Sequence, residues 1–224
     1  VVAKGRIGAM VEVNSETDFV ARNDQFQDMV RNVAGLAAAA KGDVAKLLAA
    51  EYPGKSVSVE DVVKELVATI GENMNVRRTA TVEVADGVVA DYMHNKVADG
   101  LGKIGVIVGL ESKGDKPTLY ELGRMLAMHI AATAPVALDI AGVPAETIER
   151  EKAILADKNK GKPPQVLEKI LAGGIKTYAK ENCLLEQSYI HDTTKTVTQV
   201  LAEAGKTAGE PVKITGFVRY ALGE

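Results

Sequence analysis

The chain has 224 residues, of which 46% are hydrophobic and 25% are charged, with a formal net charge of −3 and a pI near 5.8. This composition is that of an ordinary globular protein with room for one large domain or two small ones. It excludes a general nucleic-acid binder, which would carry a basic stripe, and no apolar run approaches the ~18 residues of a membrane span. The single cysteine, Cys183, excludes an internal disulfide and predicts a reducing, cytoplasmic location.

The N-terminal part predicts a strand followed by a long helix. Residues 6–13 are rich in apolar and β-branched side chains, which is typical of a strand. Apolar residues then recur at helical spacing as far as Ala40. Asn23 is suited to cap the start of this helix, and Lys41-Gly42 is suited to end it.

Two further helices are predicted before the next strand. The first is short and covers residues 43–51. The second begins at Ser58-x-x-Asp61, a spacing typical of a capping box, and ends at Gly71.

The middle of the chain predicts strands. Residues 75–85 alternate as in a strand, and Asp86-Gly87 is a turn signal, so that 88–93 is expected to return as the second strand of a hairpin. Residues 94–102 are interpreted as a polar loop, and 104–110 as a buried strand.

The sequence contains an internal repeat. Residues 5–11 (GRIGAMV) are echoed by residues 102–108 (GKIGVIV), and each copy leads through a polar connection to an amphipathic helix. The second helix is expected to open at the capping box Thr118-x-x-Glu121. The repeat predicts an α+β fold with two related halves, each a small antiparallel sheet covered by helices.

The C-terminal part predicts an inserted helical hairpin. Helices over 145–157 and 165–180 flank the lysine- and proline-rich tip at 158–164, and together they predict an antiparallel, coiled-coil-like arm. A short helix over 196–204 and a last strand over 212–220 follow, and the strand is expected to complete the second sheet.

These elements suggest three parts. Residues 1–90 are expected to form the N-terminal half of the core. Residues 91–143 and 190–224 are expected to form its C-terminal half, and residues 144–189 the helical arm.

The stretch Val11–Asp28 is the first candidate site, because Phe19 lies there among polar and charged residues in a chain with only three phenylalanines. Two interpretations of Phe19 stay open from the residues alone. It lies seven residues before Phe26, so one helix would bury both rings on the same face. Alternatively it is an exposed ring meant for another molecule. His129, at the edge of an apolar stripe, is by default a partly buried, hydrogen-bonded histidine.

Several chemistries find little support in the sequence. Carboxylates gather in the first candidate site, but their spacing fits no calcium-binding loop and no histidine accompanies them; they are Glu12, Glu16, Asp18, Asp24 and Asp28. The chain also lacks the glycine-rich motifs of nucleotide binding and the motif of a serine nucleophile. We therefore predict no cofactor, no metal site and no direct nucleotide or nucleic-acid binding.

Three separated segments resemble the elongation factor Ts family in the family's order. They are Thr17–Asn23 (TDFVARN), Gly71–Arg78 (GENMNVRR) and Ala127–Ala132 (AMHIAA). The resemblance covers most of the chain and implies a nucleotide-exchange factor for elongation factor Tu in translation elongation, not an enzyme. The chain would be the main body without the family's small N-terminal ubiquitin-associated-type domain.

The resemblance also assigns roles to residues. The family's aspartate and phenylalanine enter the GTPase domain of elongation factor Tu beside its magnesium site, which implies this role for Asp18 and Phe19, flanked by Thr17 and Val20. It implies a second contact with elongation factor Tu at His129. The helical arm supports homodimers in some members of the family.

Two other classes of function stay open. The first is a protein-binding scaffold or dimerisation module without exchange activity. The second, a carboxylate-metal hydrolase, would need a stoichiometric divalent ion.

Overall fold

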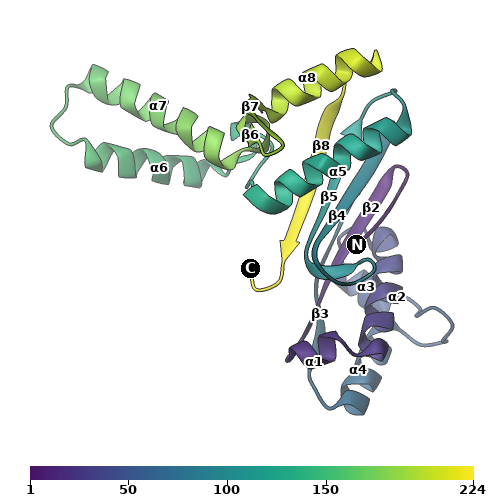
Figure 1. The fold of residues 1–224 in the computed structure, drawn as a ribbon. Coiled ribbons are helices and arrows are strands. Elements are labelled where there is room, and N and C mark those ends of the chain that lie inside the picture. Colours follow the sequence, from purple (N-terminus) through teal and green to yellow (C-terminus); the bar gives the residue numbers. More distant parts are fainter. The chain divides into compact units, whose positions relative to one another are not determined.

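The first sheet lies at the N-terminal end of the chain. The structure is a computed structural model that describes residues 1–224. Its helices and small antiparallel sheets confirm the predicted α+β class (Figure 1). The sheet has the order β1-β2-β3, with the strands β1 (Val2–Lys4), β2 (Ile7–Ser15) and β3 (Met74–Glu83). The ladder between β2 and β3 ends where Ser15 lies opposite Met74.

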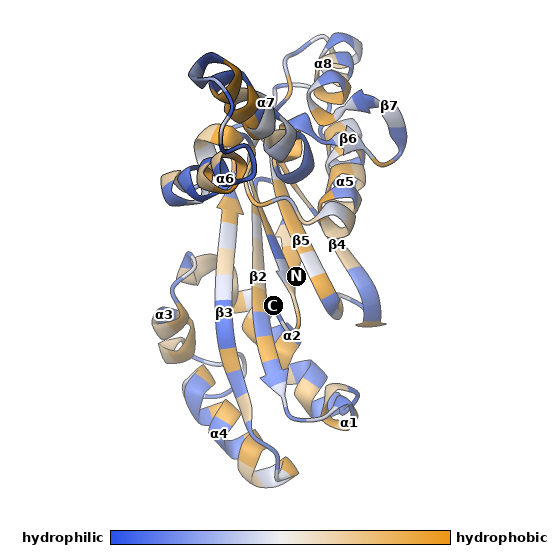
Figure 2. Cartoon of the chain, turned by 90° about the vertical axis from the view of Figure 1, so that its left-hand side faces the viewer, coloured by the Kyte–Doolittle hydropathy of each residue, from blue (hydrophilic) through white to orange (hydrophobic).

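Helices pack against this sheet around one hydrophobic core. They are α1 (Asp18–Ala21), α2 (Asp24–Ala40), α3 (Val44–Ala49) and α4 (Val59–Ile70). Phe26, Val33 and Leu47 from the helices meet Ala9 and Val76 from the strands in this core. In Figure 2, β3 changes between hydrophobic and hydrophilic colours along its length, as expected of a strand with one covered face.

The predicted ends of these helices are confirmed. The side chain of Asn23 accepts a hydrogen bond from the backbone N–H of Phe26 at 3.1 Å. Ser58 and Asp61 form the predicted capping box of α4. Gly71 ends that helix in the left-handed conformation, with φ at 84°, which glycine adopts without a steric cost.

The second sheet has the order β4-β5-β8. Its strands are β4 (Gly87–Ala98), β5 (Leu101–Glu111) and β8 (Lys213–Ala221), which confirms that the last strand completes this sheet. Helix α5 (Lys116–Thr133) packs closely on it, because a Cβ atom on Gly123 would lie only 2.6 Å from the Cβ of Ala90.

Two predictions in this region were wrong. Strands β3 and β4 form no hairpin: β3 pairs with β2, while β4 pairs with β5. Residues 94–98 also belong to β4, so the predicted polar loop is a strand and a tight turn. These residues are mostly exposed and polar, so they carry no alternation of buried and exposed positions that would mark a strand.

The predicted capping box at Thr118 was also wrong. Asp115 caps helix α5 in place of Thr118, so the helix begins three residues earlier than predicted, at Lys116. The Asp115 carboxylate accepts hydrogen bonds from the backbone N–H of Thr118 at 2.9 Å and from its hydroxyl at 2.7 Å. Aspartate is at least as good an N-cap as threonine, and the earlier position adds nearly one turn to the helix.

The two sheets meet through a second core and through the glycines of the repeat. Met10, Val84, Val89 and Ile107 are buried together between them. A Cβ atom on Gly8, the second glycine of the first repeat, would lie 2.5 Å from Val89 Cγ1. The repeat therefore marks the places where the backbone of one sheet approaches the other.

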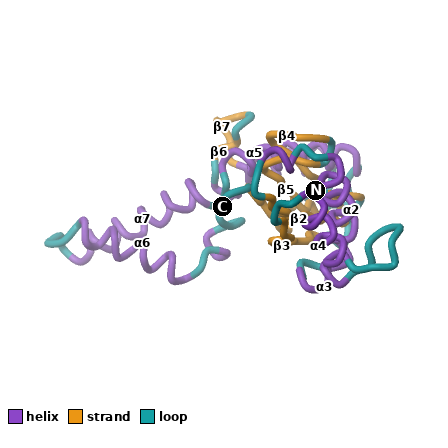
Figure 3. The backbone as a smooth tube through the Cα atoms, turned by 90° about the horizontal axis from the view of Figure 1, so that it is seen from below, coloured by secondary structure: helices purple, strands orange, loops and turns teal.

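Residues 132–209 form a compact unit of their own, separate from the unit of residues 1–131 and 210–224. It contains α6 (Ala145–Lys158), α7 (Pro164–Asn182), α8 (Val197–Ala208), β6 (Ser188–Tyr189), β7 (Asp192–Thr196) and two short 3-10 helices, η1 (Ile140–Gly142) and η2 (Leu184–Glu186). Figure 3 shows α6 and α7 side by side, joined by a loop at the tip, which confirms the predicted helical hairpin. The three-part division of the chain into 1–90, 91–143 with 190–224, and 144–189 stays a prediction.

None of the helices combines the length and the apolar character that crossing a lipid bilayer demands.

Candidate functional site

The four predicted site residues Thr17, Asp18, Phe19 and Val20 lie at the end of β2, in and beside the short helix α1. Thr17 takes the N-cap position, and the helix ends at Ala21. Because the chain turns at Arg22 and Asn23 before α2 begins, α1 and α2 are separate helices. The interpretation in which one helix buries both Phe19 and Phe26 was therefore wrong.

Phe19 is the most exposed large hydrophobic residue of the chain. It is 86% exposed, whereas Phe26 is 6% exposed and part of the first core. A single exposed apolar residue is common on protein surfaces, but leaving a phenylalanine in water forfeits about 1.5–3 kcal/mol of burial. Phe19 is therefore exposed and not buried, while its contact with another molecule stays a prediction.

Contacts on both sides hold α1 in place. Val20, the next residue along, is 5% exposed and packs in the first core. The Thr17 hydroxyl donates to Glu72 Oε1 at 2.7 Å and its backbone N–H donates to Glu72 Oε2 at 3.2 Å. At the other end of the helix, Gln27 Nε2 donates to the carbonyl of Ala21 at 3.0 Å. Phe19 therefore projects from a segment that is anchored before and after it.

Asp18 faces the second sheet. Its carboxylate lies 3.6 Å from Lys103 Nζ of β5, in a pair whose members are both largely exposed. Exposed pairs of this kind contribute little to stability. The Asp18 carboxylate is therefore accessible to a partner beside the Phe19 ring.

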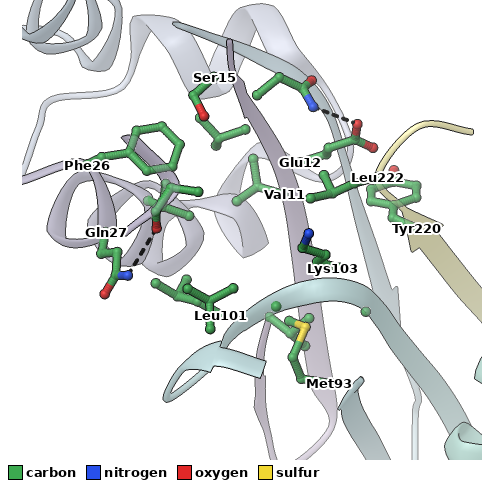
Figure 4. A pocket seen from close by; sticks show the side chains of 18 of the residues that line it. Val11, Glu12, Ser15, Phe26, Gln27, Met93, Leu101, Lys103, Tyr220 and Leu222 are labelled. Atoms are coloured by element: carbon green, nitrogen blue, oxygen red, sulfur yellow. Dashed lines mark hydrogen bonds between the residues drawn. The ribbon is translucent and has the colours of Figure 1, made fainter. Parts of the chain in front are cut away.

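A pocket of about 440 Å³ opens beside Thr17 and Asp18. Figure 4 shows it between the residues of β2 and α2 and the end of the β4–β5 hairpin, with the last residues of the chain at its rim. Val11, Val30, Leu101 and Leu222 give it apolar walls, and Lys103 brings a charge to its edge. Of the four predicted contact residues, Thr17 and Asp18 line this pocket, whereas Phe19 and Val20 do not.

Glu12 lines the same pocket but is engaged within the protein. It is 4% exposed, and its carboxylate lies 2.9 Å from Arg77 Nη1 and 2.5 Å from Arg78 Nε. Burial alone would raise the pKa of Glu12, but hydrogen bonds from Arg77, Asn14 and Arg78 outweigh it and hold that pKa below its ordinary value of 4.5. Arg77 and Arg78 thus compensate this buried carboxylate.

The other carboxylates of the first candidate site do not gather around a common point. Asp18 pairs with Lys103, and Asp28 lies 2.8 Å from Arg31. No group of three or more histidine, cysteine, aspartate or glutamate side chains lies close enough together to hold a metal ion.

His129 lies in α5 and is 0% exposed. Its imidazole takes part in interactions within the chain, in agreement with the default interpretation from its apolar surroundings. In this conformation the ring does not reach the surface, so a direct contact with another protein would require neighbouring side chains to move. The structure does not bring His129 together with Phe19 in one site.

Sequence reasoning missed the residues that hold α1. Glu72, Gln27 and Lys103 all contact this segment, and none of them stands out by type or spacing. Glu72 and Lys103 reach it only through strand pairing between distant parts of the chain.

The comparisons with known proteins agree on one family. The sequence profile described as Elongation factor TS matches residues 16–224. Elongation factor Ts of Methylobacterium nodulans is 59% identical over 224 residues, which is 100% of this chain and 73% of the relative. Elongation factor Ts of Methylocella silvestris is 59% identical over 221 residues, covering 97% of this chain and 71% of the relative. That of Xanthobacter autotrophicus is 53% identical over 224 residues, covering 100% and 73%.

Proposed function

Because the chain belongs to the elongation factor Ts family, we propose that it is a guanine-nucleotide exchange factor for elongation factor Tu in translation elongation. It binds the GDP complex of elongation factor Tu, disturbs the site that holds Mg²⁺ and phosphate, and promotes release of GDP and its exchange for GTP. No covalent bond is made or broken by the chain itself, so it is not an enzyme in that sense.

The mechanism is a competition between two ligands of one GTPase. A GTPase holds its nucleotide through phosphate contacts and Mg²⁺. The coupling between the two ligands is reciprocal: the factor by which bound nucleotide weakens the binding of the exchange factor equals the factor by which the bound exchange factor weakens the binding of nucleotide. A preference of about 10⁴ requires about 5.5 kcal/mol of differential binding. The chain must therefore make contacts that form only when the magnesium side of the nucleotide site has moved.

The exposure of Phe19 carries the proposal. Its ring is 86% exposed on a segment whose neighbour Val20 is fixed in the core. Burying the ring in the partner would contribute about 1.5–3 kcal/mol. Asp18 lies beside it with an accessible carboxylate, and Thr17 sets the start of the helix. In the proposed mechanism Phe19 and Asp18 enter the GTPase domain and displace the structure that positions Mg²⁺.

Phe19 alone falls short of the required free energy, so further contacts are needed. We propose His129 and the surface above it as the second contact. Since the imidazole is 0% exposed, it takes part only if the neighbouring side chains open when elongation factor Tu binds.

Release of a fluorescent GDP analogue from elongation factor Tu, at fixed Mg²⁺, tests the proposal. The wild-type chain should accelerate release at substoichiometric amounts, and Phe19→Ala should slow the accelerated rate severalfold or more. Val57→Ala is a matched control, because Val57 is an exposed apolar residue of the same unit, 41% exposed, and should behave as wild type. Equal rates for wild type and Phe19→Ala would reject the role of Phe19.

The alternative is a protein-binding scaffold that leaves nucleotide release unchanged. Ile154 and Val166 on the helical hairpin are exposed apolar residues, 41% and 43% exposed, and they could carry self-association. Binding to elongation factor Tu in gel filtration without faster GDP release would favour the scaffold. Sedimentation of the chain alone measures whether a homodimer forms.

A further inference from the structure

Glu72 makes a contact that continues the first sheet beyond its last backbone pair. The ladder between β2 and β3 ends with Ser15 opposite Met74. In the same antiparallel register, two residues further along, Thr17 lies opposite Glu72. There the Glu72 side chain takes the place of a backbone partner and accepts hydrogen bonds from both the N–H and the hydroxyl of Thr17, at 3.2 and 2.7 Å.

The local sequence fixes the position of Glu72. Gly71, in the left-handed conformation, ends α4, and its N–H donates to the carbonyl of Val67 at 2.8 Å. Met74, 4% exposed, starts β3 in the first core. Glu72 is therefore held between two rigid elements, and its half-buried side chain is directed to the start of α1.

Helix α1 needs such an external contact. It has only four residues, and Thr17 forms no side-chain cap of its own. Helices this short are not stable by themselves. Val20 fixes the middle of α1 in the core, and the hydrogen bond from Gln27 fixes its last residue. The Glu72 contact fixes its start, immediately before Asp18 and Phe19.

We propose that Glu72 is a positioning residue for Phe19, which acts through Thr17 and does not need to touch the partner. The inference rests on the proposed exchange function. A ring held in its binding orientation loses less conformational entropy on association, so Glu72 lowers the free-energy cost of inserting Phe19 into the partner.

The experiment is a double-mutant cycle on GDP release from elongation factor Tu. Glu72→Ala should slow the accelerated release by about two- to fivefold, the range expected for an exposed, charge-assisted hydrogen bond. Glu72→Gln retains one acceptor oxygen and should lie between wild type and Glu72→Ala. In a Phe19→Ala background, Glu72→Ala should have no further effect, because the residue that it positions is gone.

A matched control separates positioning from loss of charge. Glu65 is an exposed glutamate of α4 with one charged partner, Lys55 at 3.0 Å. Glu65→Ala should leave GDP release at the wild-type rate. If Glu72→Ala also matches wild type, or if it slows release equally with and without Phe19, then Glu72 does not act through Phe19 and the inference is wrong.

Amide hydrogen exchange of the free chain gives a second readout. The N–H of Thr17 should exchange faster in Glu72→Ala than in wild type, and at the wild-type rate in Phe19→Ala. Unchanged protection of Thr17 in Glu72→Ala would also overturn the inference. If the wild-type chain does not accelerate GDP release at all, the proposed function fails, and hydrogen exchange still decides whether Glu72 orders this segment.

Discussion

Arg78 Nε lies 2.5 Å from Glu12 Oε2, an ion pair between neighbouring strands of the first sheet, and the same arginine reaches the second sheet. Arg78 belongs to β3, and its Nη2 also donates to the carbonyl of Ala221 in β8 at 3.3 Å. Its guanidinium lies over the ring of Tyr220, 4.1 Å from the ring centre. One arginine thus compensates a buried carboxylate of the first sheet while it contacts the last strand of the second.

Glu12→Gln should lower the free energy of unfolding by about 1–3 kcal/mol, because two arginines lose their buried counter-charge. The cost stays at this level because Arg77 and Arg78 are partly exposed, with side-chain exposures of 43% and 31%, and water can solvate them. Urea unfolding of wild type and Glu12→Gln at pH 7 measures this change in the free energy of unfolding. Glu65→Ala, which removes an exposed glutamate, is the control and should change stability by less than about 0.5 kcal/mol.

The effect of Glu12 should depend on pH. Its pKa in the folded chain is lower than the ordinary value of 4.5, so the carboxylate stabilises the fold above about pH 4.5 and loses this contribution as the pH falls through the folded-state pKa. The difference in stability between wild type and Glu12→Gln should therefore be constant near neutral pH and shrink in acid. A difference that stays the same down to pH 3 would contradict the assignment.

Truncation of Phe26 should destabilise the fold, whereas truncation of Phe19 should leave its stability almost unchanged. Phe26→Ala removes a ring from the first core and should cost about 3–5 kcal/mol. Phe19→Ala removes a ring that is 86% exposed and should leave the melting temperature within about 2 °C of wild type. Calorimetry of both variants measures this. A strongly destabilised Phe19→Ala would mean that the ring serves the fold, and any loss of nucleotide exchange would then have a structural cause.

His129→Ala should be destabilising, because the side chain is 0% exposed and truncation leaves a cavity, at a cost of about 1–3 kcal/mol. Leu119→Ala, a truncation of a 1% exposed residue in the same helix, is the comparison. If His129 is a second contact, its variant should bind elongation factor Tu more weakly than the leucine variant at equal fraction folded. Equal binding would limit His129 to a structural role.

The glycines of the repeat should differ in their tolerance of alanine. A Cβ atom on Gly8 would lie 2.5 Å from the stiff side chain of Val89, whereas one on Gly105 would meet the flexible end of Met10 at 2.6 Å and Val1 Cγ2 at 2.9 Å. Gly8→Ala should therefore cost about 1–3 kcal/mol through overpacking, and Gly105→Ala clearly less. Gly216→Ala, with open space around the site, is the control. Equal costs at Gly8 and Gly105 would show that the contact between the sheets relaxes more easily than the structure implies.

The sequence predictions that depend on short-range interactions were mostly correct, with the cap at Thr118 as the exception. The caps at Asn23 and Ser58 depend on residues three positions away, and both were predicted correctly. The partner of β3 is β2, whose Ser15 lies opposite Met74 from a distant part of the sequence. No local signal contains that choice, and the turn signal at Asp86 wrongly favoured a hairpin.

In the candidate site, too, local features were predicted and contacts between distant parts of the chain were not. The residues and the family resemblance indicated Phe19 as a candidate contact residue. Its spacing to Phe26 left its exposure open, because the turn at Arg22 and Asn23 decides whether α1 and α2 are one helix or two. The contact of Glu72 with Thr17 depends on strand register and was not predictable. The surroundings of His129 predicted a partly buried side chain, whereas the structure buries it completely.

Cys183 offers a probe of the unit formed by residues 132–209. It is the only cysteine, it is 0% exposed, and it packs with Ala137, Val143 and Ala179. Burial raises the pKa of its thiol above the ordinary value of 9.0, which lowers the thiolate fraction at neutral pH. Alkylation in the native chain should therefore be slower than in the unfolded chain by at least about a hundredfold, and it should be limited by opening of this unit.

The same labelling tests whether the two compact units open together. If residues 132–209 open alone, Cys183 should be alkylated at urea concentrations at which the other unit is still folded. The variant Phe26→Ala weakens only that other unit, so it should leave the alkylation rate of Cys183 unchanged. If the chain unfolds as one cooperative block, Phe26→Ala should speed alkylation in proportion to its loss of stability. Rapid alkylation of the native wild-type chain would contradict the burial of Cys183 itself.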